Sequence, residues 1–322
     1  MPKLAAIGEV LIDFAPAGLS AKNNTLFECC PGGAPANVAV QAARLGVESA
    51  FIGKVGDDDF GRLLQKTLAA NGVGTRGLVL DPDNHTTLAF VQLDEHGDRS
   101  FSFYRDPGAD TQLRMDEVNE DVFAACDLLH YGSLLFTTEP GRTTTYELLK
   151  KARAAGKVLS YDPNWRAPLW KDKQRGLQEM KAGLPFCDIL KVSEEELPLL
   201  TGETDAEKGL AALHAAGPAV VALTMGPQGC IISNRSGYAH CPTYNTKVVD
   251  TTGSGDSFFG AFLSCVLKSG KAPAQLTLEE LKEFAAYGNA AGSTCATAAG
   301  AIPALPGDDA IRACMATVPL LK

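Results

Sequence analysis

The sequence lacks the cysteine and histidine motifs that hold metals or form redox pairs. Its nine cysteines include no C-x-x-C, and its five histidines show no paired spacing. Cys29 and Cys30 are adjacent, which makes an awkward disulfide and a poor metal pair. We therefore expect buried, reduced thiols in a cytoplasmic protein, and neither a disulfide framework nor a zinc site.

Long apolar runs and an excess of positive charge are also missing. No apolar stretch approaches the ~18 residues that a membrane helix needs. Residues 1–14 carry Glu9 and Asp13 and lack a basic start, so we expect no signal peptide. The 322 residues include 29 Lys and Arg and 38 Asp and Glu, which gives a formal net charge of −9. This balance argues against nucleic acid or an anionic membrane as a partner, although it permits a small phosphate pocket.

Two familiar nucleotide-binding signatures are absent. The P-loop pattern G-x-x-x-x-G-K-[ST] occurs nowhere in the chain. The glycine turn near the end of the chain, Gly253 to Gly255, is followed by Gly260, which does not match the dinucleotide fingerprint. A dinucleotide oxidoreductase is therefore poorly supported.

What the sequence does contain is an alternation of apolar runs with helical patterns, in a composition of 45% hydrophobic and 21% charged residues. The expected strands are 4–14, 50–55, 127–135, 158–162, 189–192 and 220–224; the expected helices include 35–45, 60–68, 144–155 and 206–215. Such alternation predicts an α/β fold, with a mostly parallel sheet covered by helices on both faces.

One segment interrupts this alternation. Residues 86–93 and 99–106 are two β-rich runs around a polar turn, which predicts a hairpin. In the second run Phe101, Phe103 and Arg105 share one face by the two-residue period of a strand. The hairpin is either a lid that closes on a ligand or a static edge hairpin.

The late glycine motif is Gly253-Ser254-Gly255-Asp256, which opens an apolar helical run. Backbone N–H groups at such a helix start attract anions, and glycine lets a phosphate approach the backbone. Asp256 would repel bound phosphate, so its presence needs a reason. It is either a base that accepts the proton of an attacking hydroxyl or an acid that favours the helix dipole.

A second glycine turn lies early in the chain. Gly32 and Gly33 permit close approach to the backbone, and Pro35 suits the first turn of a helix. Asn37 follows in the first helical turns, and Asp13 is expected at the end of the first strand. Ligand sites of open α/β sheets lie at such strand ends, and paired Asn and Asp groups suit the hydroxyls of a sugar.

Together, the two glycine motifs resemble the signatures of the PfkB (ribokinase-like) family of carbohydrate kinases, and within it most resemble fructokinases. The resemblance spans nearly the whole chain and includes Gly8-Glu9 with Asp13, 32–39, 51–58, 103–110, 130–133, 161–166 and Leu169-Trp170. It implies a ribokinase-like three-layer sandwich in a single domain, 1–322, with a small β lid inserted from about 14–30 and 86–110.

The resemblance also implies an activity: ATP-dependent phosphorylation of D-fructose to fructose 6-phosphate, with Mg²⁺. Asp256 would be the catalytic base, and the backbone amides of Gly253, Ser254, Gly255 and Asp256 would form the anion hole for the transferring phosphoryl group. The residues implied to hold the sugar are Asp13, Gly32, Gly33, Asn37, Arg105, Asn164 and Arg166.

The same resemblance places further residues near the nucleotide and its ions. The implied nucleotide-binding residues are Lys191, Ser193, Thr224, Gly226, Gly229 and Asn289; Glu196 is implied for Mg²⁺, and Asp250 and Thr252, with carbonyls of 295–300, for a monovalent cation such as K⁺. A homodimer is implied as well. Two positions depart from the family pattern: Ser193 replaces an asparagine, and Ser254 replaces an alanine.

Several alternatives stay open on the sequence. A kinase for 2-keto-3-deoxygluconate, ribose or a nucleoside would share these motifs. A non-catalytic sugar-binding protein on the same fold is the alternative from another class, because fold does not imply function. For Arg166 the alternative role is a structural ion pair.

Overall fold

The structure is a computed structural model that describes residues 3–93 and 99–321. The turn of the expected hairpin, 94–98, and the side chain of Phe101 lie outside the described part. No helix within that part is long and apolar enough to cross a membrane.

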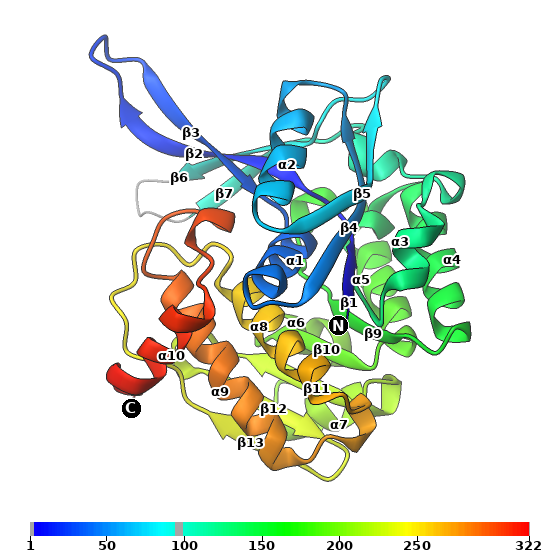
Figure 1. Cartoon of the computed structure of the whole chain (residues 1–322), viewed down its shortest axis with the longest axis vertical. Helices are drawn as coiled ribbons and strands as arrows, with labels where there is room; N and C mark the ends of the chain where they lie inside the picture. Colours follow the sequence, from blue (N-terminus) through cyan, green and yellow to red (C-terminus); the bar gives the residue numbers. More distant parts are fainter. Residues whose placement is uncertain (1–2, 94–98, 322) are drawn as a thin grey trace.

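A large, mostly parallel sheet forms the centre of the molecule (Figure 1). Within the described residues it has nine strands in the order β13-β12-β11-β10-β9-β8-β1-β4-β5. Their bounds are β1 Lys3–Ile7, β4 Glu48–Gly56, β5 Val73–Asp81, β8 Leu128–Gly132, β9 Val158–Asp162, β10 Ile189–Ser193, β11 Val220–Thr224, β12 Cys230–Asn234 and β13 Gly237–Cys241. Only the pairs β11–β12 and β12–β13 are antiparallel among the pairings of this sheet.

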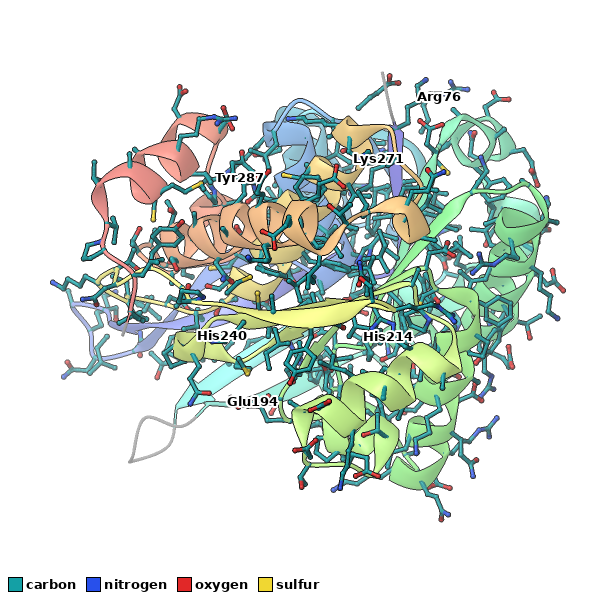
Figure 2. The ribbon with its side chains drawn as sticks, turned by 90° about the horizontal axis from the view of Figure 1, so that it is seen from below. Arg76, Glu194, His214, His240, Lys271 and Tyr287 are labelled. Carbon is teal, nitrogen blue, oxygen red and sulfur yellow. The ribbon has the colours of Figure 1, made fainter. Side chains whose placement is uncertain are left out.

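Helices cover both faces of this sheet, because its central strands are apolar on both sides. They are α1 Ala34–Arg44, α2 Asp59–Ala70, α3 Glu120–Ala125, α4 Gly141–Ala154, α5 Lys173–Gly183, α6 Glu196–Thr201, α7 Ala206–Ala216, α8 Ser254–Ser269, α9 Leu278–Cys295 and α10 Asp308–Thr317. One core packs α1, α2, α8 and α9 against one face, and a second core packs α3 to α7 against the other. Figure 2 shows the edge of the sheet that β12 and β13 form, with α9 on one side and α7 on the other. The expected α/β sandwich is confirmed.

A second, smaller sheet lies across one end of the first. Its order is β3-β2-β6-β7, with β2 Leu11–Leu19, β3 Thr25–Gly32, β6 Leu88–Leu93 and β7 Arg99–Tyr104. Strands β6 and β7 form the expected antiparallel hairpin. The tip of the β2–β3 hairpin projects from the body of the molecule (Figure 1).

Two expected strands are wrong in their extent. The run 4–14 is divided: β1 ends at Ile7 and β2 begins at Leu11, so Asp13 lies in the small sheet. The chain passes close beneath α1 at Gly8, where a Cβ would lie 2.4 Å from the Pro35 side chain, and this packing turns it out of the large sheet. The run 127–135 ends as a strand at Gly132, and Leu134–Thr137 form a 3₁₀ turn.

Candidate active site

A cavity of about 300 Å³ lies between the small sheet and the carboxyl ends of the central strands. Strands, helix starts and loops that are distant in sequence all contribute to its wall. The lining residues are Glu9, Leu11, Asp13, Gly33, Ala34, Asn37, Phe103, Leu134, Asn164, Arg166, Lys191, Thr251, Thr252, Gly253, Gly255 and Asp256. The two glycine motifs therefore meet at one site, as open α/β sheets favour.

Asp256 lies in the first turn of α8. This helix begins directly after Gly253, which has a left-handed backbone conformation. Gly253 has φ +77°, and a Cβ there would approach Ala301 to 3.1 Å, so the turn requires glycine. Asn37 on α1 donates from Nδ2 to Asp256 Oδ2 at 2.7 Å. Burial raises the pKa of Asp256 to about 6; Asp162 adds to this shift, whereas Asn37, Lys191 and Arg166 oppose it. Asp256 is thus a half-buried carboxylate with a raised pKa, beside the helix-terminal N–H groups of α8.

Asp13 faces the same cavity from β2. Burial raises the pKa of Asp13 to about 6, and Arg166 opposes the shift. Its position requires the early glycines, since a Cβ on Gly32 would lie 2.7 Å from Asp13 Oδ2. Gly33 has φ +112°, and a Cβ there would lie 2.5 Å from the carbonyl oxygen of Glu9. Two carboxylates with raised pKa values therefore line the same cavity.

Asn164 and Arg166 follow β9 on one wall. Asn164 adopts φ +47°, and its backbone N–H donates to Asp162 Oδ1 at 3.2 Å. The exposed Arg166 guanidinium donates to the Trp165 carbonyl at 3.1 Å and forms no ion pair with any described residue. The structural ion pair considered for Arg166 is therefore not what this structure contains.

Arg105 is held away from the cavity that contains Asp256. Its side chain is buried, forms an ion pair with Asp110 at 2.6 Å, and donates to Thr137 Oγ1 and to the Leu134 carbonyl at 2.9 Å each. These bonds attach the end of β7 to the body of the protein.

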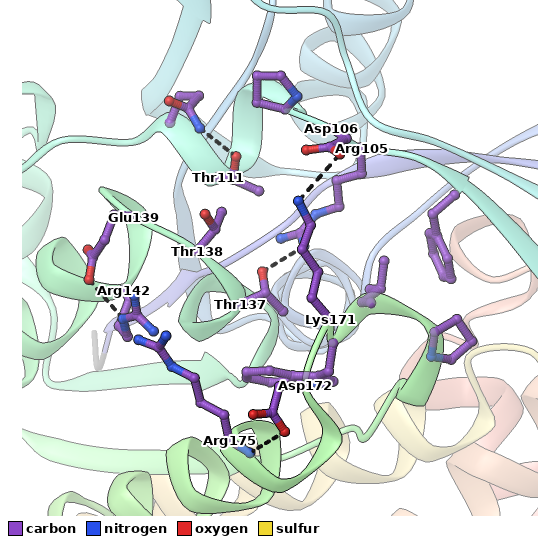
Figure 3. A pocket seen from close by; sticks show the side chains of 16 residues that line it. Arg105, Asp106, Thr111, Thr137, Thr138, Glu139, Arg142, Lys171, Asp172 and Arg175 are labelled. Carbon is purple, nitrogen blue, oxygen red and sulfur yellow. Dashed lines mark hydrogen bonds and ion pairs between the residues drawn. The ribbon is translucent and has the colours of Figure 1, made fainter.

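The groove on the other side of Arg105 is a second cavity of about 500 Å³ (Figure 3). Arg142, Lys171 and Arg175 line it from the body, and Arg142 and Arg175 both approach Glu179 Oε1, at 3.2 and 3.9 Å. Phe103 borders both cavities, whereas Arg105 lines only the larger one.

Two acidic residues of the site had no assigned role in the sequence reasoning. Glu9 is buried, accepts from the Ala34 N–H at 3.1 Å through Oε1, and has a pKa raised by burial to about 7. Asp162, at the end of β9, forms an ion pair with Lys191 at 2.8 Å. The signal that could have found them is a carboxylate directly at the end of an apolar run, where burial of a charge needs an explanation.

The residues implied for the nucleotide lie together outside the cavity lining, except Lys191. Thr224 pairs with Ser193 across β10 and β11. Gly226 and Gly229, with φ +53° and +84°, form the turn after β11. Asn289 donates to the carbonyls of Cys241 and Pro242, at 2.9 and 3.1 Å, and so braces the chain beside that turn.

Both carboxylate oxygens of Glu196, the residue implied for Mg²⁺, accept backbone hydrogen bonds. Its Oε1 accepts from the Trp165 N–H at 2.6 Å and its Oε2 from the Ser193 N–H at 2.9 Å. Burial raises the pKa of this carboxyl. The described part of the chain also contains no cluster of three or more His, Cys, Asp or Glu side chains that could hold a metal.

Asp250 joins the two loops implied for a monovalent cation. Its Oδ1 accepts from the N–H and the hydroxyl of Thr252, at 2.9 and 2.7 Å. Its Oδ2 accepts from the Gly300 N–H at 3.0 Å, while the Ala296 carbonyl accepts from Val249 N. The structure therefore brings together all the segments that the resemblance implied for this ion.

Comparison with known proteins decides the family of the chain. Residues 1–308 match the model of the pfkB family carbohydrate kinases. The chain belongs to this family. It is 44% identical to probable fructokinase-5 of Arabidopsis thaliana, over 95% of this chain and 94% of that protein, and 41% identical to fructokinase-1 of Zea mays, over 94% of each.

Solved structures of pfkB-like kinases share its fold. Fructokinase of Xylella fastidiosa with bound ATP has a TM-score of 0.91 at 32% identity and covers 98% of each chain. Fructokinase of Vibrio cholerae, a double mutant with bound fructose, ADP and potassium ion, has a TM-score of 0.87 at 33% identity, with 98% of each chain covered. This pfkB-family chain is therefore an ATP-dependent sugar kinase by its relatives and its fold.

Proposed function

We propose that this protein is a fructokinase, which transfers the γ-phosphoryl group of ATP to the 6-hydroxyl of D-fructose. The observation that carries the proposal is the half-buried Asp256, hydrogen-bonded to Asn37 beside the N–H groups that open α8. The fructokinases named above support fructose as the acceptor, and their bound ATP, ADP and fructose support the two ligands.

In the proposed reaction the sugar lies between Asp13 and Asp256. Asp13, Asn37 and the backbone at Gly32 and Gly33 hold its hydroxyls, with Asn164 and Arg166 on the facing wall. Asp256 accepts the proton of the attacking hydroxyl, which strengthens the nucleophile as it approaches phosphorus. The N–H groups of Gly253, Gly255 and Asp256 donate to the charge that accumulates on the phosphoryl oxygens, whereas the Ser254 N–H donates to the Thr251 carbonyl at 3.1 Å.

Arg105 supports this site from outside it. Because its guanidinium is occupied by Asp110, Thr137 and Leu134, we assign it to holding strand β7 and Phe103 over the sugar.

ATP occupies the side of the cavity toward Thr224, Gly226 and Gly229. Mg²⁺ enters with the phosphates of ATP, since this cation is commonly bound by phosphates and few carboxylates. Asp250 and Thr252 hold a monovalent cation next to the anion hole, an assignment supported by the potassium ion of the V. cholerae enzyme.

A screen of acceptors tests the proposal. ADP release is measured with fructose, glucose, mannose, ribose, inosine and 2-keto-3-deoxygluconate, each over a concentration series. We expect the highest kcat/KM with fructose. A preference of tenfold or more for another acceptor would replace fructose, and sugar binding without any ADP release would favour the non-catalytic alternative.

A related kinase is the second candidate. Aminoimidazole riboside kinase of Salmonella enterica, in complex with its riboside and an ATP analogue, has a TM-score of 0.84 at 30% identity. A riboside would have to reach past Phe103 toward the larger cavity beside Arg105. The inosine arm of the same screen decides this point.

A further inference from the structure

A buried ion pair, Lys191 with Asp162, lies at the floor of the candidate active site. We infer that Lys191 is a catalytic residue that contacts the transferring phosphoryl group, and that Asp162 is a positioning residue that holds the Lys191 ammonium in place. The inference rests on the proposed kinase function and adds a cation to the donors of the anion hole.

The sheet brings these two side chains together. Strands β9 and β10 are parallel neighbours, with Ser160 opposite Ile189 and Tyr161 opposite Leu190. Asp162 and Lys191 come next in that register, so their side chains leave the same face of the sheet at its carboxyl end. Lys191 Nζ lies 2.8 Å from Asp162 Oδ2, and both side chains are almost fully buried.

The ammonium also touches the glycine turn before α8. A Cβ built on Gly255 would lie 3.3 Å from Lys191 Cε and 3.4 Å from Nζ. Any larger residue at position 255 would therefore meet the lysine. The positive charge is adjacent to the backbone that is proposed to receive the phosphoryl group.

The charges around the cavity explain why a cation is needed here. Glu9, Asp13 and Asp256 line it, and Glu196 lies close behind Lys191. In their ionised forms these carboxylates repel the γ-phosphate of ATP. Among the described lining residues Lys191 is the buried cation, whereas Arg166 is exposed. Although burial opposes it, attraction to Asp162 and Glu196 raises the pKa of Lys191, so it stays charged.

The chemical step places Lys191 at the point of charge build-up. The sugar hydroxyl oxygen forms a bond to the γ-phosphorus, while the bond from that phosphorus to the ADP oxygen breaks and leaves its electron pair on ADP. The hydroxyl proton passes to Asp256. Lys191 keeps its protons. One N–H remains hydrogen-bonded to Asp162, and the others donate to phosphoryl oxygens, which stabilises the charge of the transition state.

The alternative is that Lys191 only neutralises buried acids. Three variants separate the two roles: Lys191→Met, Asp162→Asn, and the two combined. Removal of one partner of a buried pair leaves an unpaired charge and destabilises the protein, while removal of both is often tolerated. A structural role therefore predicts that the combined variant regains both stability and activity.

We expect a different result for a catalytic lysine. Lys191→Met lowers kcat by about 10²–10³-fold, as for loss of one transition-state donor, with the fructose KM within about threefold. The combined variant regains melting temperature but not kcat. In Lys191→Ala, added methylammonium or ethylammonium restores part of kcat, because a small cation can enter the vacated space.

A matched control is the other buried lysine pair, Lys54 with Asp81 at 3.1 Å, which lies outside the cavity lining. Lys54→Met should lower the melting temperature and leave the kcat of the folded protein within about twofold. If the combined variant recovers kcat to within threefold of wild type, the inference is wrong. If wild type phosphorylates no sugar at all, the proposed function fails instead, so the two failures are distinguishable.

Discussion

At the scale of single residues, the site is a set of carboxylates whose protonation differs from that of exposed acids. Burial raises the pKa of Asp13 and of Asp256 to about 6 and that of Glu9 to about 7. Such groups cost stability when they are ionised, and they persist where chemistry uses them.

Asp256→Asn should abolish turnover while ligand binding remains. Asparagine keeps the shape of the side chain but cannot accept a proton, and a general base contributes about 10²–10⁴-fold to the rate. Steady-state kcat and calorimetric affinities for fructose and ATP are the measurements. Activity within threefold of wild type would rule out Asp256 as the base.

The pH dependence of kcat/KM should reflect the ionisation of Asp256. Because Asp256 must be ionised to accept a proton and its pKa is raised to about 6, kcat/KM should fall as the pH drops through about 6. A rate profile from pH 5 to 9 measures this. A flat profile down to pH 5 would contradict the raised pKa.

Asp13→Asn should weaken fructose binding and stabilise the apoprotein above pH 6. A carboxyl whose folded pKa, about 6, exceeds its ordinary value of 3.8 favours the folded state at low pH and loses this contribution as the pH rises through 6. The melting temperature should therefore exceed that of wild type at pH 8, and the difference should shrink below pH 4. Fructose KM should rise at least tenfold with ATP KM nearly unchanged, and an equal rise in both would contradict a sugar-binding role.

At the scale of elements, the small sheet forms one wall of the site. Its strand β7 carries Phe103 over the cavity, and the buried pair of Arg105 with Asp110 holds the end of that strand. If this sheet is a lid, sugar binding should order it, because closure excludes the water that would otherwise hydrolyse ATP.

Hydrogen exchange tests the lid. Saturating fructose should slow amide exchange in β6 and β7 more than in the central strands, and ATP alone should do so less. The main-sheet strands β9 and β10 serve as the internal reference. Unchanged exchange in β6 and β7 would leave a static edge hairpin as the better description.

At the scale of the whole molecule, the projecting β2–β3 hairpin exposes several large apolar side chains. Leu19, Leu26 and Phe27 are 64%, 42% and 43% exposed on the projecting β2–β3 hairpin, on both faces of its strands. These residues suit the homodimer implied by the family resemblance. Light scattering should then report a dimer for wild type.

A charge introduced on the β2–β3 hairpin should dissociate the expected homodimer. Phe27→Glu should shift the mass toward the monomer without a loss of helical circular dichroism, and Leu63→Glu, at an exposed position of α2, serves as the control. A wild-type monomer at micromolar concentration would contradict the homodimer.

Local patterns in the sequence determined much of this protein. Alternating runs predicted the α/β sandwich, and Gly32-Gly33 and Gly253-Ser254-Gly255 predicted the two turns of the site, because left-handed or crowded backbone positions demand glycine at that position itself. These features depend on neighbours within a few residues, so they can be read without the fold.

Only the tertiary structure decided the partners of distant side chains. The contact of Gly8 with Pro35 divided the first expected strand and carried Asp13 into the small sheet. Arg105 had the strand period of a lining residue, yet Asp110 and Thr137 hold it outside the cavity. Lys191 pairs with Asp162 because β9 and β10 are neighbours in the sheet. No local sequence pattern predicts that these two strands are adjacent. The order of the strands depends on the packing of the whole chain. The partner of a buried charge depends on it too, because a buried charge needs an opposite charge nearby and only the fold determines which one is near.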